Sequence, residues 1–251
     1  MRASVVARAV AAASLVALSC APVSAAEIKV MAVNAVKGAL TELAADFEKS
    51  SGHKVTIAWG GTEAITKRVT DGEAADIVLI AAPNIERLIA GGRLRAGSRA
   101  DFARVGVGVA VRAGLPKPDI SSGEAVKSAV LAAKSVAYST GPSGFYLVEM
   151  FRKMGIADQI KDKVKQPSSG TQIAEMLARG DADLGFQQVS ELLHAKGIDY
   201  LGPLPADIQN ITIYAAALHN AEPDAAKALL DFLTAPGAAT SVRKIGLDPP
   251  R

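Results

Sequence analysis

Short apolar runs alternate with amphipathic stretches along most of this chain. The runs carry hydrophobic residues at nearly every position, which is typical of strands buried on both faces of a sheet. Turn-forming or polar residues bound each of them. The predicted strands are Ile28–Val33, Lys54–Ala58, Asp76–Ala81, Val105–Val111, Ser135–Ser139, Asp183–Phe186 and Ile211–Leu218.

Helical patterns fill the stretches between these runs. Val36, Leu40, Leu43 and Phe47 fall on one helix face,. Ser121 and Glu124 have the spacing of a capping box, which predicts a helix that opens there and ends at Ala133. Further helices are predicted for 62–69, 143–154, 173–177, 225–233 and 238–245. Strands alternating with helices predict parallel βαβ units and therefore an α/β fold.

Four loops of one kind follow predicted strands and precede predicted helices. They are rich in Gly, Ser, Thr and Asn: 33–36, 60–62, 141–144 and 168–171. The start of a helix presents backbone N–H groups without intrahelical partners and a partial positive charge. Several such starts around one cleft would hold an anion without a lysine or arginine. The sequence therefore predicts an anion-binding site built from these loops.

The first 26 residues have the pattern of a secretory signal peptide. Arg2 and Arg8 precede a short apolar stretch, and small residues follow at 23–26,. The apolar stretch is too short to span a bilayer, and no later stretch is long enough. We therefore expect an exported, periplasmic protein. Cys20 leaves lipidation open as an alternative; under ordinary cleavage the mature chain has no cysteine, hence no disulfide and no thiolate metal site.

Composition excludes some partners. Without residues 1–26 the chain keeps 26 basic residues against 25 acidic ones, and aromatic residues make up only 4%. This gives no nucleic-acid-binding signature.

The sequence also shows no motif for a metal or a cofactor. His53, His194 and His219 have no metal-ligand spacing, so no metal site is predicted. Gly106 and Gly108 lie inside a predicted strand with no helix after it, so we expect no dinucleotide site and no cofactor.

Four segments in this order resemble the bacterial periplasmic solute-binding proteins of the molybdate-binding type. They are Ala39-Leu40, Gly72–Val78, Arg179–Gly185 and Leu230–Pro236. The resemblance implies the two-domain type II fold, in which two α/β domains close on a ligand. It assigns 27–108 plus 209–251 to domain I and 109–208 to domain II. The implied partners are a small anionic ligand and an ABC transporter permease, and the implied state is a monomer.

The same resemblance places the ligand-holding residues, and here the chain departs from its relatives. Serine hydroxyls and a tyrosine hold the oxyanion in that family. The matching positions are Ala35, next to Asn34; Gly61-Thr62; and Gln188, next to Gln187. None keeps the family's side chain. The amides of Gln187 and Gln188 suit a carboxylate better than a tetrahedral metal oxyanion.

The ligand-binding candidates are therefore the polar loop residues and their neighbours. For several of them, capping a helix is the alternative to contacting a ligand, notably for Thr62, Ser143, Ser169 and Thr171. Lys37 and Glu63 are expected in solvent. The predicted set is Asn34, Ala35, Gly61, Thr62, Ser143, Gly144, Ser169, Thr171, Gln187 and Gln188.

Two functions follow from this set. The first is capture of a small anion, an organic carboxylate or an oxyanion, for an ABC importer. The alternative is an isomerase acting on a tricarboxylate, because Gly185–Leu192 also resembles a branch that includes an aconitate isomerase. An isomerase needs a base placed on a proton beside a carboxylate. The nearby candidates for that base are Glu63, Lys37, Tyr138 and His194, and Glu63 is the one assigned if the protein is an isomerase.

Overall fold

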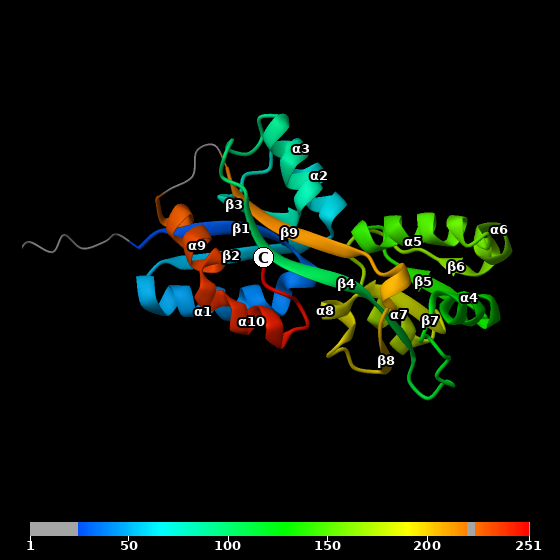
Figure 1. Cartoon of the computed structure of the whole chain (residues 1–251). Helices are drawn as coiled ribbons and strands as arrows, with labels where there is room; N and C mark the ends of the chain where they lie inside the picture. Colours follow the sequence, from blue (N-terminus) through cyan, green and yellow to red (C-terminus); the bar gives the residue numbers. More distant parts are fainter. Residues whose placement is uncertain (1–24, 220–223, 251) are drawn as a thin grey trace, which may run out of the picture.

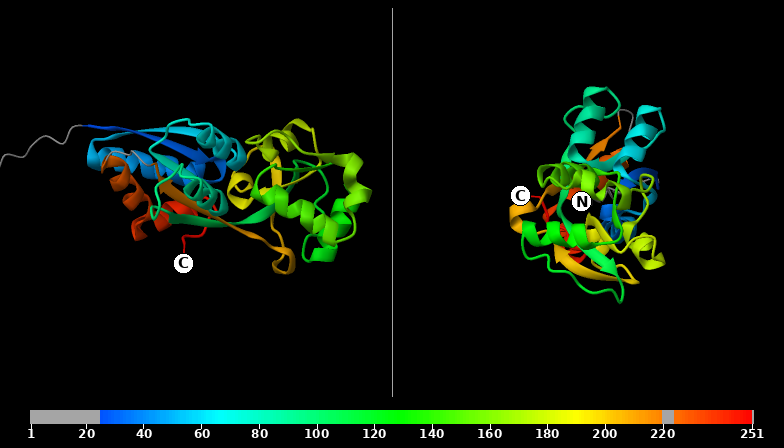
Figure 2. Two further views of the ribbon diagram at one scale, coloured as in Figure 1. Left: turned by 90° about the horizontal axis from the view of Figure 1, so that it is seen from above. Right: turned by 90° about the vertical axis from the view of Figure 1, so that its right-hand side faces the viewer.

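A computed structural model describes residues 25–219 and 224–250 (Figure 1). The described chain forms two lobes that lie side by side along one axis (Figures 1 and 2). The predicted signal peptide, except for its last two residues, and Cys20 lie outside the described residues. The two lobes are joined by long strands, and the predicted loops meet where the lobes face each other.

The first lobe is built on a mixed sheet. β1 (Glu27–Val33) lies between β2 (Lys54–Gly60) and β3 (Ile77–Ala81), and both pairings are parallel. β9 (Ile211–Leu218) pairs antiparallel with β3. β3 is buried along its whole length, as its uninterrupted apolar sequence requires,.

Helices cover both faces of this sheet. α2 (Thr62–Thr70) and α3 (Ala82–Ala90) lie on one face. The opposite face is covered by α1 (Lys37–Ser51), α9 (Asp224–Thr234) and α10 (Ala239–Lys244) (Figure 1). Because each helix turns its apolar stripe to the sheet, the lobe has one continuous core,.

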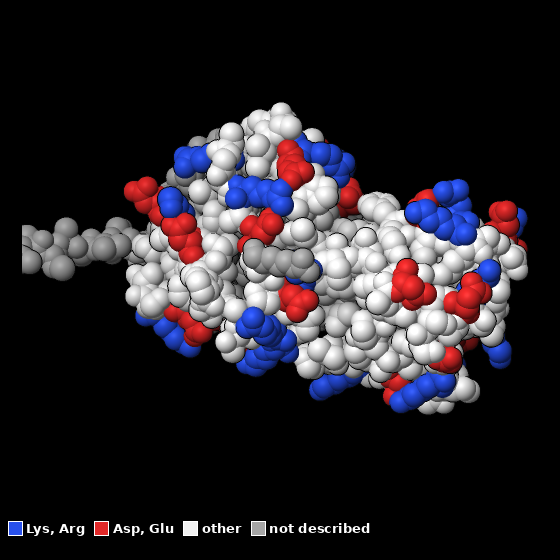
Figure 3. All heavy atoms as spheres, viewed as in Figure 1, with Lys and Arg blue, Asp and Glu red and all other residues white. Residues whose placement is uncertain are grey.

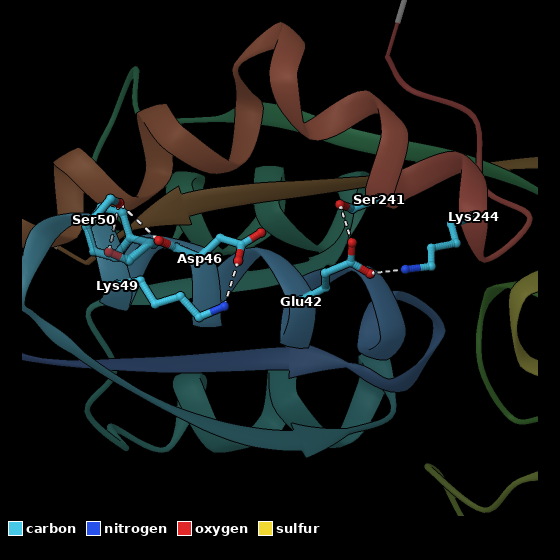
Figure 4. A network of polar contacts seen from close by, with 7 residues as sticks. Glu42, Asp46, Lys49, Ser50, Ser241 and Lys244 are labelled. Carbon is cyan, nitrogen blue, oxygen red and sulfur yellow. Dashed lines mark hydrogen bonds and ion pairs between the residues drawn. The ribbon is translucent and has the colours of Figure 1, made fainter.

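Polar contacts hold α10 against α1, nearly two hundred positions earlier in the chain. Ser241 Oγ donates to Glu42 Oε1 at 3.2 Å, and Lys244 Nζ donates to Glu42 Oε2 at 2.9 Å (Figure 4). The hydrogen bond from Lys244 is the main reason why the pKa of Glu42 is lowered. The C-terminal segment therefore completes the first lobe rather than the second.

β4 (Ala100–Arg112) runs through both lobes and is the main connection between them. Its first half pairs antiparallel with β9, from Ala100 to Gly106. Its second half pairs antiparallel with β7 (Leu184–Gln188) and with β8 (Ile198–Pro203). The chain returns from β8 to β9, so two segments cross between the lobes.

The second lobe adds two more strands and five α-helices. β5 (Val136–Tyr138) pairs parallel with β7 and with the short β6 (Val164–Lys165). The whole sheet has the order β2-β1-β3-β9-β4-β7-β5-β6, with β8 on β4. The helices are α4 (Gly123–Ala132), α5 (Pro142–Lys153), α6 (Ala157–Ile160), α7 (Ile173–Arg179) and α8 (Val189–Leu192). The 3₁₀ helices are Asn34–Val36, Lys161–Lys163, Ala206–Ile208 and Pro236–Ala238.

The buried apolar residues form separate clusters in the two lobes. One cluster draws on positions 28–105 and 214–247. The other two draw on positions 107–208. The change from one to the other falls within β4. We propose that the lobes are domains I and II with the bounds given above, since each has its own core.

Several details differ from the sequence predictions, and three helices, α3, α6 and α8, were not predicted. The cap of α4 is Ser122, whose Oγ accepts from Ala125 N, and not Ser121, whose N–H donates to Asp119. The strands are not all parallel, because β4 and β9 run against their neighbours. β6 and β8 were not predicted; β6 has two residues, and every residue of β8 keeps some exposure, so neither shows a buried apolar run.

Charges of both signs are scattered over both lobes on the face that Figure 3 shows, and no large patch of one sign stands out there. Among the described residues, no helix combines the length and the apolar character that a bilayer crossing requires,.

Candidate functional site

A small inner cavity of about 30 Å³ lies between the lobes, where the four predicted loops meet. The ends of three strands, the loops after two strands and before one helix, and single residues of a further strand and helix surround it. None of the residues that line it is Lys, Arg or His. The lining is Val33, Asn34, Gly60, Gly61, Thr62, Ser139, Gly141, Pro142, Ser143, Ser169, Gly170, Thr171, Gln187, Gln188, Glu191 and Tyr214.

The first lobe contributes the loop after β2 to this cavity. α2 begins at Thr62 with Gly61 as its N-cap, and no side chain caps it. Thr62 is buried, and its Oγ1 has no hydrogen-bond partner among the described residues. The capping alternative for Thr62 is thus wrong. A buried hydroxyl without a partner is costly unless something absent from the structure satisfies it.

The two lobes touch at the cavity, so the described conformation is closed. Asn34 Nδ2 donates to the carbonyl oxygen of Gly170 at 3.0 Å, from lobe to lobe. A Cβ on Gly61 would overlap Ser169 Oγ and would lie 2.7 Å from the Gly170 nitrogen. Glycine at position 61 is therefore what allows the backbones to approach this closely.

The second lobe contributes the loop between β5 and α5. Ser143 is buried in the first turn of α5, and its Oγ lies 3.1 Å from Ser139 Oγ. The N-cap of α5 is Gly141, so Ser143 does not cap the helix. Gly144 does not line the cavity. A Cβ there would overlap the carbonyl oxygen of Ser139, so Gly144 lets the helix start close to β5.

The loop before α7 forms the next part of the wall. Ser169 Oγ has no partner among the described residues, whereas Thr171 Oγ1 lies 3.2 Å from Ser168 Oγ. The N-cap of α7 is Gln172, so neither Ser169 nor Thr171 occupies that position. Ser169 thus joins Thr62 as an unpaired hydroxyl at the cavity.

The two glutamines at the end of β7 differ in their environment. Gln187 uses both ends of its amide within the protein: Oε1 accepts from Ile173 N at 2.8 Å, and Nε2 donates to Glu191 at 2.9 Å. Gln188 Nε2 donates to Thr212 Oγ1 at 2.9 Å, but its buried Oε1 has no partner among the described residues. Gln188 therefore has a free acceptor at the cavity, and Gln187 supports its neighbours.

Two ionisable residues of the cavity were missed by the sequence analysis. Glu191, half-buried at the start of α8, accepts from Gln187 and from Gln172 Nε2 through Oε1. Burial raises its pKa to about 7, although both hydrogen bonds act against this. Burial also raises the pKa of the Tyr214 hydroxyl, and the charge of Glu191 adds to that effect. Tyr214 therefore stays a neutral phenol at neutral pH.

Comparison with known proteins shows the family to which the chain belongs. Residues 28–248 match the family model described as bacterial extracellular solute-binding protein. The chain belongs to this family. It is 36% identical over 230 residues to an aconitate isomerase from a Pseudomonas species, covering 88% of this chain and 87% of that one. It is 30% identical to the molybdate-binding protein ModA of Azotobacter vinelandii, with 91% and 92% covered.

The fold of this solute-binding protein is the type II periplasmic binding protein fold. A solved structure of the Azotobacter vinelandii periplasmic molybdate-binding protein superposes with a TM-score of 0.76 at 22% identity, covering 89% of this chain and all of that one. The sulfate-binding protein SubI of Mycobacterium tuberculosis superposes with a TM-score of 0.69 at 19% identity, with 89% and 87% covered. The sequence prediction of the fold is confirmed.

Other candidates of this solute-binding protein lie outside the inner cavity. Ala35 is buried beside it and lines a neighbouring hollow of about 680 Å³, which also contains Lys37 and His194 and is called here the His194 groove. Lys37 Nζ lies 5.7 Å from the centre of the Trp59 ring. Lys37 is exposed, as predicted.

Glu63 points away from the inner cavity. It lines a different hollow of about 720 Å³, where Asn84 Nδ2 donates to Glu63 Oε1 at 3.0 Å and the Arg87 guanidinium lies 3.8 Å from the same oxygen. Although Glu63 directly follows Thr62, the helix turns the two side chains about 100° apart. Its carboxylate is thus already engaged by partners of its own lobe.

The described residues contain no group of three or more His, Cys, Asp and Glu side chains that could hold a metal ion. Two tyrosines near the loops have structural roles. Tyr138 packs against Phe151 in the second core, and Tyr146 Oη donates to the carbonyl oxygen of Ile208 at 2.6 Å. The cavity chemistry therefore rests on hydroxyls, amides, backbone and one carboxyl group.

Proposed function

We propose that this protein encloses a small carboxylate in the inner cavity and isomerises it, with an aconitate-type tricarboxylate as the substrate. The observation that carries this proposal is the combination of unpaired polar groups with the carboxyl group of Glu191 in one cavity. The 36% identity to a protein named aconitate isomerase supports the same class.

The unpaired groups suit a substrate that carries carboxylates. The hydroxyls of Thr62 and Ser169 can donate to carboxylate oxygens, and the first turn of α2 adds backbone N–H groups,. Gln188 Oε1 cannot donate, so it suits a protonated or polar part of the ligand. Hydrogen bonds of this kind replace the water that a carboxylate loses on binding.

Glu191 distinguishes a reaction site from a simple anion-binding site. A carboxylate in the lining repels an anionic ligand, so a protein selected for anion affinity alone gains nothing from it. A group with a pKa near neutrality can both accept and donate a proton,. Moving a double bond in an unsaturated carboxylic acid requires such a transfer, since one C–H bond breaks and another forms.

The closed form must open for the substrate to enter. A cavity of about 30 Å³ is far smaller than the few hundred Å³ typical of sites for small organic ligands,. Opening would separate Asn34 from Gly170 and move the lobes about the two crossover segments,. We propose that the exported protein works in the periplasm as a monomer.

A second candidate is capture of the same anion for an ABC importer, without chemistry. Membership of the solute-binding family and the lobe-to-lobe hydrogen bond favour it. The ABC transporter permease would then be the partner, and Glu191 would be neutral in the complex. Both candidates share one cavity and one ligand class, so turnover decides between them.

The test is to incubate the purified mature protein with cis- or trans-aconitate and to follow both isomers by NMR. We expect conversion in both directions to the same equilibrium ratio. Calorimetry with aconitate, citrate, molybdate and sulfate then defines the ligand class. Binding of a carboxylate without conversion would support the second candidate, and micromolar binding of molybdate alone would contradict both.

A further inference from the structure

Glu191 occupies the wall between the inner cavity and solvent. It lies on α8, directly after β7, and it lines both the inner cavity and the His194 groove. A carboxyl group in this position can exchange a proton with a ligand on one side and with water on the other. Of the carboxylate side chains among the described residues, Glu191 alone lines the inner cavity.

The Glu191 side chain is held in place by two amides. Gln172 Nε2 and Gln187 Nε2 both donate to Oε1, at 3.2 and 2.9 Å. Gln187 is fixed in turn by Ile173 N, which donates to its Oε1 at 2.8 Å. Two donors on one carboxylate oxygen leave the other oxygen, Oε2, available for a proton.

The electrostatic setting favours proton transfer. Burial raises the pKa of Glu191 to about 7, and the hydrogen bonds from Gln172 and Gln187 act in the opposite direction. Tyr214, on the cavity side, has a raised pKa and is therefore no base at neutral pH. Lys37, Glu175 and His194 are the other ionisable groups of the groove that Glu191 lines.

We propose that Glu191 is the catalytic residue that transfers the proton in this isomerisation, and that Gln172 and Gln187 position it. This inference rests on the proposed function. The carboxylate takes a proton from the methylene carbon next to a substrate carboxylate. The C–H electron pair forms a double bond to the central carbon, and the pair of the former double bond accepts a proton at its far carbon. Glu191 then donates a proton to that carbon, after exchanging with water on the groove side, so no oxidant, reductant or co-reactant is consumed.

The deciding experiment measures chemistry and binding separately in Glu191→Gln. General base catalysis typically contributes about 10²- to 10⁴-fold, so we expect kcat to fall by that much. The Kd for trans-aconitate should stay the same or decrease, because a repelling charge is removed. Glu175→Gln, an exposed carboxylate of the same groove, is the matched control and should keep full activity.

Hydrogen exchange at carbon gives a second measurement. The wild type in D₂O should place deuterium in the methylene group of aconitate, and Glu191→Gln should not. Glu191→Asp keeps a carboxyl group at a longer distance and should retain part of the exchange. Circular dichroism confirms folding of each variant; if Glu191→Gln does not fold, Glu191→Asp carries the test with the same readouts.

The positioning role of Gln172 is tested by its effect on the pH profile. Its hydrogen bond lowers the pKa of Glu191, so Gln172→Met should move the rise of kcat/KM with pH to higher pH. Activity should return in more alkaline buffer, which a general loss of structure would not allow. His194→Gln is the control for a titrating imidazole and should leave the profile in place.

The outcomes separate the two proposals. An active wild type together with an active Glu191→Gln, retaining more than a tenth of kcat, overturns the role of Glu191 and keeps the isomerase. Loss of activity in Glu63→Gln instead would assign the base to the residue predicted from sequence. A wild type that binds aconitate without converting it overturns the isomerase and, with it, the role of Glu191.

Discussion

The two walls of the inner cavity are built differently. The wall of the first lobe offers a backbone turn, one unpaired hydroxyl on Thr62 and the amide of Asn34. The wall of the second lobe holds most of the hydroxyls, both glutamines and Glu191. Tyr214, which also lines the cavity, comes from the crossover strand β9, whose residues pair with both β3 and β4.

On the proposed function, this difference separates closing of the lobes from proton transfer. The first wall has no ionisable side chain at the cavity, but Gly61 lets it approach the second wall closely. The second wall keeps its polar groups in one rigid frame of β5, β7 and the helices that follow them. A residue of the first wall should therefore affect ligand capture, whereas a residue of the second wall should affect folding, proton transfer or both.

The largest effect is expected for Gly144→Ala in the frame of the second wall. The added methyl would overlap the backbone oxygen of Ser139, which cannot move without β5. We expect a loss of about 3 kcal/mol in the free energy of unfolding, measured by urea denaturation. Gly237→Ala is the matched control, since its Cβ would meet open space. Equal stability of the two variants would contradict the close approach of α5 to β5.

A pH-dependent stability is expected from the second wall. The folded pKa of Glu191, about 7, lies above the ordinary value of 4.5. The folded state therefore binds this proton more tightly than the unfolded state does. The resulting contribution of Glu191 to the free energy of unfolding is complete below about pH 4.5 and is lost as the pH rises through 7. Its size is at most about 3 kcal/mol.

The comparison of wild type with Glu191→Gln isolates that contribution, because all other ionisable groups are common to both. The difference between their unfolding free energies should change between about pH 4.5 and 7, in favour of the variant at the higher pH, and should level off above that range,. A constant difference over this range would mean that Glu191 is already ionised at pH 5.

The sequence predicted the loops of both walls because their signal is local. Gly60-Gly61-Thr62 and Ser169-Gly170-Thr171 combine turn residues with a following helix, and a short window is enough to recognise this,. The strands β1, β3 and β9 were recognised by their apolar runs. β8 was not, because its residues are only partly buried on β4.

Glu191 and Tyr214 could not be recognised in the same way. A Glu at a helix start usually lies in solvent, and a Tyr in an apolar strand usually lies in the core. Their place in the cavity depends on the register of β4 with β7 and with β9, which is a long-range property. The spacing of Gln187 and Glu191, four residues apart, was the one local hint,.

Gly61→Ala tests closing in the first wall. The methyl would meet Ser169 and Gly170 only when the lobes are together, so the first lobe should fold normally. We expect about a hundredfold weaker binding, or about 2.7 kcal/mol, measured by calorimetry with trans-aconitate. Unfolding by urea should match the Gly237→Ala control, and small-angle scattering should show a more open molecule. Unchanged affinity would indicate that ligand binding does not need the closed contact.

The hydroxyl of Thr62 gives the smallest predicted effect and the most direct test of the first wall. Its Oγ1 caps nothing and has no partner among the described residues, so Thr62→Val removes the proposed ligand contact without removing a structural one. A hydrogen bond to a charged group is typically worth about 1.5–3 kcal/mol, so binding should weaken roughly ten- to a hundredfold. Thr70→Val is the matched control, because that exposed hydroxyl donates only to the carbonyl oxygen of Thr66.

The turnover of bound substrate in Thr62→Val should change less than its affinity does, since the proposed proton transfer takes place at the opposite wall. If Thr62→Val lowered kcat as strongly as Glu191→Gln while keeping its affinity, the division between a closing wall and a reacting wall would be wrong.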